Sequence, residues 1–124
     1  MANDLSVTLD KSKTPWLVDI DQKNGANQVA RSNQSQTITW QLTGDAASGN
    51  ITGFSWLQQP NAGIFEDPVI APNGNTMTMS DLNNSASTTG DWTYQLTIEV
   101  GGQSYQSAAT SLTDTSTNPT IKNN

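Results

Sequence analysis

Carboxylate side chains are the first residues in this sequence that could support chemistry, and they occur in two short groups. Asp19 and Asp21 alternate just before an Asn-Gly turn, a spacing that can begin a calcium loop. Lys23 stands at the third ligand position of such a loop, and Ala30 stands where a bidentate glutamate would be. We therefore favour solvated carboxylates at a strand end. Calcium binding by Asp19 and Asp21 is the alternative.

Glu66 and Asp67 form the second group of carboxylates. Adjacent residues of an extended segment point to opposite faces, so these two cannot act as a pair. An acid–base pair would require Glu66 to meet Glu99 or Asp91 across a substrate cleft. No spacing indicates such a cleft. A carboxylate-based enzyme is therefore the least favoured interpretation, and we expect no catalytic residues.

The four tryptophans are the third candidate, because an exposed aromatic ring on a sheet or loop can serve as a platform for a sugar ring. Each tryptophan shares period-two parity with a neighbouring apolar residue, which favours core packing. Trp16 lies near a strand end, and Leu57 faces away from its neighbour Trp56, so these two could form a ligand surface. The predicted core consists of Ile38, Trp40, Phe54, Trp56, Trp92, Tyr94, Leu96 and Ile98.

The residue types that are missing exclude several classes of function. The chain has 124 residues with no Cys and no His, so a disulfide, a thiol nucleophile and a Ser-His-Asp triad are ruled out. Its net charge is -6 with five Lys and Arg residues, so we expect no nucleic-acid partner and no anionic membrane partner. No apolar run approaches the length of a membrane span.

The start of the chain, MANDLSVTLDKSKTPW, lacks the apolar segment of a signal peptide. Taken at face value, this predicts a cytoplasmic protein. If the chain is the mature part of a longer protein, association with a cell surface or a virion is the alternative.

The candidate residues must be positioned by strands, because no stretch shows a helical apolar period. The longest element is a β-hairpin over residues 91–112, in which Gly101 and Gly102 supply the positive φ of the turn. This turn predicts three cross-strand pairs: Ile98 with Tyr105, Leu96 with Ser107 and Tyr94 with Ala109.

Further strands are predicted from alternating patterns at residues 5–9, 16–20, 36–42, 51–58 and 76–82. Val29 suggests a short edge strand, and residues 64–65 and 69–70 suggest a short or irregular one. The sum is an all-β sandwich of about seven or eight antiparallel strands. We expect one domain over residues 1–113, followed by a polar, mobile tail over residues 114–124.

Three segments resemble parts of immunoglobulin-like domains. Trp56-Leu57-Gln58-Gln59-Pro60 resembles the strand that carries their core tryptophan, and Thr76 to Leu82 resembles the strand before the tyrosine corner. Gly90-Asp91-Trp92-Thr93-Tyr94-Gln95-Leu96 is similar to that corner. Residues 51–112 also resemble polycystic-kidney-type and related bacterial immunoglobulin-like modules, with Tyr94–Ile98 in the place of their corner and following strand.

The resemblance implies a Greek-key sandwich, with the Tyr94 hydroxyl bonded to loop backbone. Leu96 stands where antibodies have a cysteine, so apolar packing replaces the disulfide. A free-standing bacterial or phage immunoglobulin-like family without assigned activity fits best.

The function we predict is a non-catalytic module that acts in protein–protein interaction or as a structural part of an assembly. A protein partner or self-association is expected, with strand edges near residues 5–9 and 103–112 as the contact surfaces. A carbohydrate- or calcium-binding module is the first alternative, with a glycan as its partner or calcium as its only cofactor.

Overall fold

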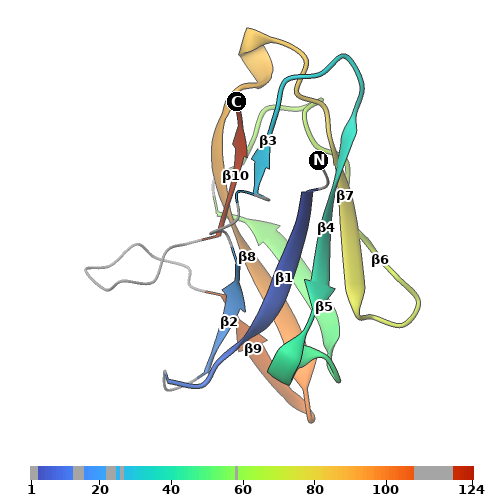
Figure 1. The fold of residues 1–124 in the computed structure, drawn as a ribbon, viewed down its shortest axis with the longest axis vertical. Coiled ribbons are helices and arrows are strands. Elements are labelled where there is room, and N and C mark those ends of the chain that lie inside the picture. Colours follow the sequence, from blue (N-terminus) through green and yellow to red (C-terminus); the bar gives the residue numbers. More distant parts are fainter. Residues whose placement is uncertain (1–2, 13–15, 22–24, 26, 58, 108–118) are drawn as a thin grey trace.

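The computed structural model describes residues 3–12, 16–21, 25, 27–57, 59–107 and 119–124. These residues form ten strands and two single-turn 3-10 helices (Figure 1). The strands are β1 (Asn3–Asp10), β2 (Leu17–Ile20), β3 (Gln28–Val29), β4 (Gln36–Leu42), β5 (Asn50–Trp56), β6 (Val69–Ile70), β7 (Thr76–Asp81), β8 (Gly90–Val100), β9 (Gln103–Gln106) and β10 (Thr120–Asn123); the helices are η1 (Gly44–Ala46) and η2 (Ala86–Thr88). The fold is all-β, as the period-two patterns predict.

The strands form two sheets of mixed direction. One sheet has the order β2-β1-β4-β7-β6, and the other has the order β3-β10-β8-β5, with β9 also paired to β8. Two pairs are parallel, β1 with β4 and β3 with β10. The prediction of seven or eight antiparallel strands is therefore wrong in number and in direction. Alternation is the same in both chain directions, so it cannot distinguish parallel from antiparallel pairing.

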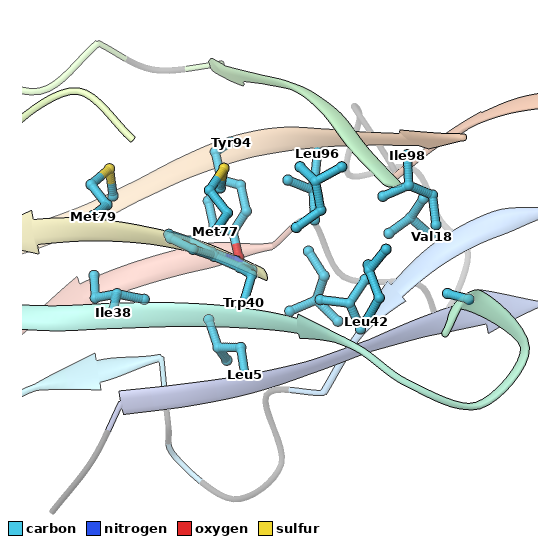
Figure 2. Close-up of a cluster of buried hydrophobic side chains, with 14 of the residues drawn as sticks. Leu5, Val18, Ile38, Trp40, Leu42, Met77, Met79, Tyr94, Leu96 and Ile98 are labelled. Atoms are coloured by element: carbon cyan, nitrogen blue, oxygen red, sulfur yellow. The ribbon is translucent and has the colours of Figure 1, made fainter. Parts of the chain in front are cut away.

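The core lies between the two sheets (Figure 2). Trp40 of β4 and Tyr94 of β8 come from opposite sheets and are both fully buried. The Trp40 Nε1–H donates a hydrogen bond of 2.9 Å to the Tyr94 hydroxyl. The resemblance led us to expect loop backbone as the partner of that hydroxyl, and the structure shows the indole of Trp40 instead. The bond therefore ties the two sheets together through the core.

The eight residues predicted to form the core all lie in or against it. Six of them are buried, whereas Phe54 and Trp56 are partly buried and pack against the core cluster. A bulge in β5 shifts the register between Ile51 and Gly53. Because a bulge adds one residue, Ile51 and Phe54 both face the core although their parities differ.

The hairpin of β8 and β9 has the predicted turn and register. Gly101 and Gly102 have positive φ, and Ile98 lies opposite Tyr105. Ser107 exchanges hydrogen bonds with Leu96, since its N–H donates to the Leu96 carbonyl and its hydroxyl accepts from the Leu96 N–H. The predicted partner of Tyr94, Ala109, lies outside the described residues. Pro119 stands at that place, because its carbonyl accepts from the Tyr94 N–H at 3.0 Å.

The last residues of the chain belong to the sandwich, which corrects the predicted mobile tail for residues 119–124, whereas residues 114–118 lie outside the described residues. β10 pairs with β8 antiparallel and with β3 in parallel, and Ile121 is fully buried. β9 pairs with Thr97–Val100 and β10 with Gly90–Thr93, so the two strands share one edge of β8. The segment escaped prediction because Ile121 is its only large apolar residue, and a single residue shows no period.

Strand edges also differ from the expectation. β1 is not an edge, because Val7–Asp10 pairs with β2 and Asn3–Val7 pairs with β4. The outer strands are β2 and β6 in one sheet and β3 and β5 in the other. Residues 103–106 form β9 at the margin of the second sheet, and residues 108–112 of the predicted contact surface lie outside the described residues. The strand edges available for contact are therefore those of the outer strands rather than that of β1.

Candidate functional site

The carboxylates proposed for calcium lie at the exposed end of β2. Asp19 is on the strand and Asp21 directly follows it, with its main-chain N–H bonded to the Ser6 carbonyl at 2.9 Å. Both side chains are exposed, and Lys23 lies outside the described residues. Within the described ranges, no group of three or more His, Cys, Asp or Glu residues could hold a metal ion. Calcium binding stays a prediction without a gathered set of ligands.

The carboxylates considered for acid–base chemistry lie on different sheets. Glu66 runs alongside β7, where its N–H donates to the Ser80 carbonyl at 3.2 Å. Asp91 and Glu99 lie near opposite ends of β8, about 26 Å apart at the rise of an extended strand. The structure therefore does not gather these carboxylates into one group.

Trp16 is partly exposed and lies where the two sheets meet. Its indole stacks on the Tyr105 ring with a centroid separation of 5.5 Å and an interplanar angle of 19°. The Lys11 ammonium lies 4.7 Å from the indole centroid and 3.7 Å from an Asp45 carboxylate oxygen. Trp16 keeps 36% of its surface exposed, so its indole remains available for a ligand. A ligand that stacks on the Trp16 indole must share the ring with Tyr105 and Lys11.

The other proposed surface residue, Leu57, is 41% exposed and directly follows β5. Its N–H donates to the Thr93 carbonyl at 3.0 Å, which extends the pairing of β5 with β8. Trp92, the second tryptophan near a strand end, is buried and meets the Phe65 ring edge-on at 5.4 Å. Trp92 therefore offers no exposed platform. Trp16 precedes β2 of the first sheet and Leu57 follows β5 of the second sheet, so strand pairing does not bring these two side chains together.

Among the large apolar side chains of the described residues, the one with the highest exposed fraction was not among the predicted site residues. Val69 is 64% exposed and its neighbour Ile70 is 41% exposed, and together they form the edge strand β6. In Figure 1, β6 lies at the outer margin of its sheet beside β7. The sequence did indicate that one of these side chains is exposed, because two consecutive apolar residues in a strand cannot both face the core. We call this feature the β6 edge.

A buried polar network was also missed. Asn83 is fully buried, and its Nδ2 donates to the carbonyls of Val29 and Asn124, both at 2.9 Å. The Thr88 hydroxyl donates to Asn83 Oδ1 at 2.9 Å. These bonds connect the loop after β7 with η2, β3 and the end of the chain. Asparagine in a loop predicts a turn rather than burial, so the sequence did not reveal this role.

Asp81 is the most unusual member of this region. It is fully buried at the end of β7, and its Oδ1 accepts a bond of 2.9 Å from Asn123 Nδ2. Burial raises the pKa of Asp81 from the usual 3.8 to about 6, although the bond from Asn123 acts to lower it. The period-two pattern indicated this burial, since Asp81 continues the series of Met77 and Met79 on the core-facing side of the strand.

No model of a known protein family matches this chain, and no curated protein matches it. Within the described residues, neither of the two short helices has the length and apolar character to cross a membrane. Functional inference therefore depends on the surfaces themselves.

Proposed function

We propose that this protein is a non-catalytic binding module that takes up an extended segment of a partner polypeptide at the β6 edge. The observation that carries the proposal is the exposure of Val69 and Ile70, 64% and 41%, on an outer strand. β-Branched residues are favoured in strands because they pack against cross-strand and same-face neighbours, and β6 has such a neighbour only in β7. An added strand would supply the missing neighbour.

An immunoglobulin-like Greek key is part of the proposal. Two facing sheets, the long β8–β9 hairpin and the aromatic core around Trp40, Trp56 and Tyr94 support it. The parallel addition of β1 to β4 is a departure from the antiparallel pattern. In this scheme β1 and β2 extend the first sheet on the side opposite the β6 edge.

The main chain of the β6 edge is oriented for strand addition. Val69 lies opposite Thr78 and Ile70 lies opposite Met77, and the Ala71 N–H donates to the Thr76 carbonyl at 2.8 Å. Bonded and non-bonded pairs alternate in an antiparallel ladder, so Ile70 occupies a non-bonded position. Its N–H and C=O therefore point away from β7, toward the place of an incoming strand.

Charge indicates the chemistry of the partner. Glu66 and Asp67 precede β6 in the chain, and both side chains are exposed. The whole chain carries a net charge of -6. A partner segment with alternating apolar residues and a flanking Lys or Arg would complement this edge in shape and in charge. Pro68 and the short length of β6 restrict pairing to a few residues, which limits uncontrolled aggregation.

The test uses synthetic extended peptides with alternating Val and Thr, flanked either by Lys or by Glu, and measures binding by calorimetry. We expect saturable binding of the Lys-flanked peptide and weaker binding of the Glu-flanked one. Ile70→Pro removes the outward N–H without removing a bond to β7, so this variant should fold and lose the peptide.

Leu57→Thr is the matched control, because Leu57 has the same 41% exposure as Ile70 but lies on the other sheet. Its binding should equal that of the unaltered protein. Equal binding by Ile70→Pro, or loss of binding in Leu57→Thr, would refute strand addition at β6. Light scattering of the same variants shows whether a second copy of the chain is the partner, since a dimer that Ile70→Pro disrupts identifies self-association.

Glycan binding at Trp16 is the second candidate, supported by the 36% exposure of this indole and its stacking on Tyr105. Aromatic surfaces of this kind take the apolar face of a sugar ring. A glycan array read with the unaltered protein and with Trp16→Ala tests it. Glycan signals that persist in Trp16→Ala would show that the indole is not the platform.

A further inference from the structure

Three buried side-chain oxygens lack a hydrogen-bond partner among the described residues, and two of the three lie on one bonded pair at the end of the sandwich. These two are Oδ2 of Asp81 and Oδ1 of Asn123, and their side chains already share one bond, from Asn123 Nδ2 to Asp81 Oδ1 at 2.9 Å. Leaving a buried acceptor without a partner is costly, and more so for a charged group. Two such atoms on one bonded pair therefore require an explanation.

The orientation of the Asn123 amide is defined by its own contacts. Its Nδ2 donates one hydrogen to Asp81 Oδ1 and the other to the Thr88 carbonyl, at 2.8 Å. Rotating the amide would place its oxygen against these two acceptors. Asn123 Oδ1 and Nδ2 therefore cannot exchange places, and only a hydrogen-bond donor can satisfy Asn123 Oδ1.

We propose that Asp81 holds a proton on Oδ2 in the folded protein and pairs with the Asn123 amide through two hydrogen bonds, one in each direction. Asn123 Nδ2 donates to Asp81 Oδ1, and Asp81 Oδ2–H donates to Asn123 Oδ1. One proton thus gives a partner to both orphaned oxygens and removes the buried charge.

Among the described residues, no Lys or Arg is buried that could keep the carboxylate ionised. β3, β4 and η2 carry no charged residue, and Asp81 is the only one on β7. Gln36 lies directly opposite Asp81 on β4, and Phe65 bridges to Asp81 on the other side. The charged side chains on the neighbouring described segments are all exposed: Arg31, Glu66, Asp67, Asp91 and Lys122.

The Asp81–Asn123 pair, which we call the latch, connects the C-terminal strand β10 to the first sheet. Asp81 belongs to the first sheet, whereas Asn123 belongs to β10, which is held by β8 and β3 of the second sheet. Loss of the proton would leave a buried carboxylate facing the Asn123 carbonyl oxygen. The docking of β10 is therefore strongest at mildly acidic pH and weakens as the pH rises past the pKa of Asp81.

The direct test is carbon-13 NMR of the Asp81 carboxyl carbon in the full chain, assigned by comparison with Asp81→Asn. We expect the protonated form at about pH 4.5 and the ionised form at about pH 7.5. Protection of the Lys122 and Asn124 amides, which bond to Asn27 and Val29, should fall over the same range after correction for intrinsic exchange. An Asp81 that is already ionised at the lower pH would overturn the proposal.

A pair of variants separates the latch from general charge effects. Asp81→Asn reproduces the protonated state, because its amide can donate to Asn123 Oδ1 and accept from Asn123 Nδ2. We expect its β10 protection to be independent of pH. Asp19→Asn makes the same change on an exposed strand residue and should keep the pH response of the unaltered protein. A pH response that survives in Asp81→Asn would show that another group controls β10.

Discussion

Replacing Tyr94 by Phe tests the bond that joins the two sheets. The substitution keeps the ring and removes only the hydroxyl, which accepts from Trp40 Nε1–H at 2.9 Å. Both residues are 0% exposed, so water cannot replace the lost acceptor. An orphaned buried donor costs about 1–3 kcal/mol, and we expect the free energy of unfolding to fall by that amount.

Urea unfolding followed by tryptophan fluorescence measures the loss, and an unchanged m value would show that the denatured state is the same. A double-mutant cycle with Trp40→Phe isolates the bond, because without the donor the hydroxyl has no indole partner to lose. The coupling energy should lie in the range of about 0.5–3 kcal/mol for residues in contact. Tyr105→Phe, on the partly exposed tyrosine, should change stability by less than about 0.5 kcal/mol.

Equal costs of Tyr94→Phe in the presence and absence of the Trp40 indole would refute this reasoning, because the cycle would then show no coupling.

A second observable comes from titration. Burial raises the pKa of Tyr94 above its usual range, although the bond from Trp40 acts to lower it. Tyrosinate absorbance from Tyr94 should therefore appear only when alkali unfolds the protein.

Three further predictions concern stability and are checked by denaturant or thermal unfolding. The pKa of Asp81 is about 6 in the folded protein against the usual 3.8, so the folded protein binds this proton more tightly than the unfolded chain does. The stabilisation by the bound proton is complete below about pH 4 and is lost as the pH rises through 6. The difference in free energy of unfolding between the unaltered protein and Asp81→Asn should therefore change with pH by at most about 3 kcal/mol, and a difference that stays constant would contradict the prediction. Gly49→Ala would place a Cβ too close to the main-chain oxygen of Glu99, so we expect the free energy of unfolding to fall by about 1–3 kcal/mol, and an unchanged midpoint would mean that the backbone moves aside at little cost. Ile121→Ala removes a fully buried side chain of β10 and should cost about 2–5 kcal/mol, whereas a negligible cost would show that β10 contributes little to the fold.

The candidate surfaces were only partly predictable. Leu57 was expected to face the surface and is exposed, whereas the pattern favoured core packing for Trp16, which is 36% exposed. The β6 edge was recognised as a short apolar pair, but its exposure depends on β6 being the last strand of its sheet. Strand order comes from which chain segments meet after folding, and local periodicity does not contain that information.

Local chemistry explains why much of the fold could be anticipated. The alternation along residues 36–42 and 90–100 specifies strands and their buried faces, because side chains of an extended chain point in turn to opposite sides. Gly101 and Gly102 specify the hairpin turn, since positive φ is accessible to glycine without strain. The absence of Cys and His excludes disulfide and imidazole chemistry whatever the fold.

Tertiary structure alone decided the rest. Parallel pairing of β1 with β4 and the recruitment of β10 arise from contacts between residues distant in sequence. The partnership of Asp81 with Asn123 joins residues 42 positions apart. A carboxyl group has its usual affinity for a proton until the fold removes its water and sets an amide beside it, and that environment exists only once both sheets are assembled.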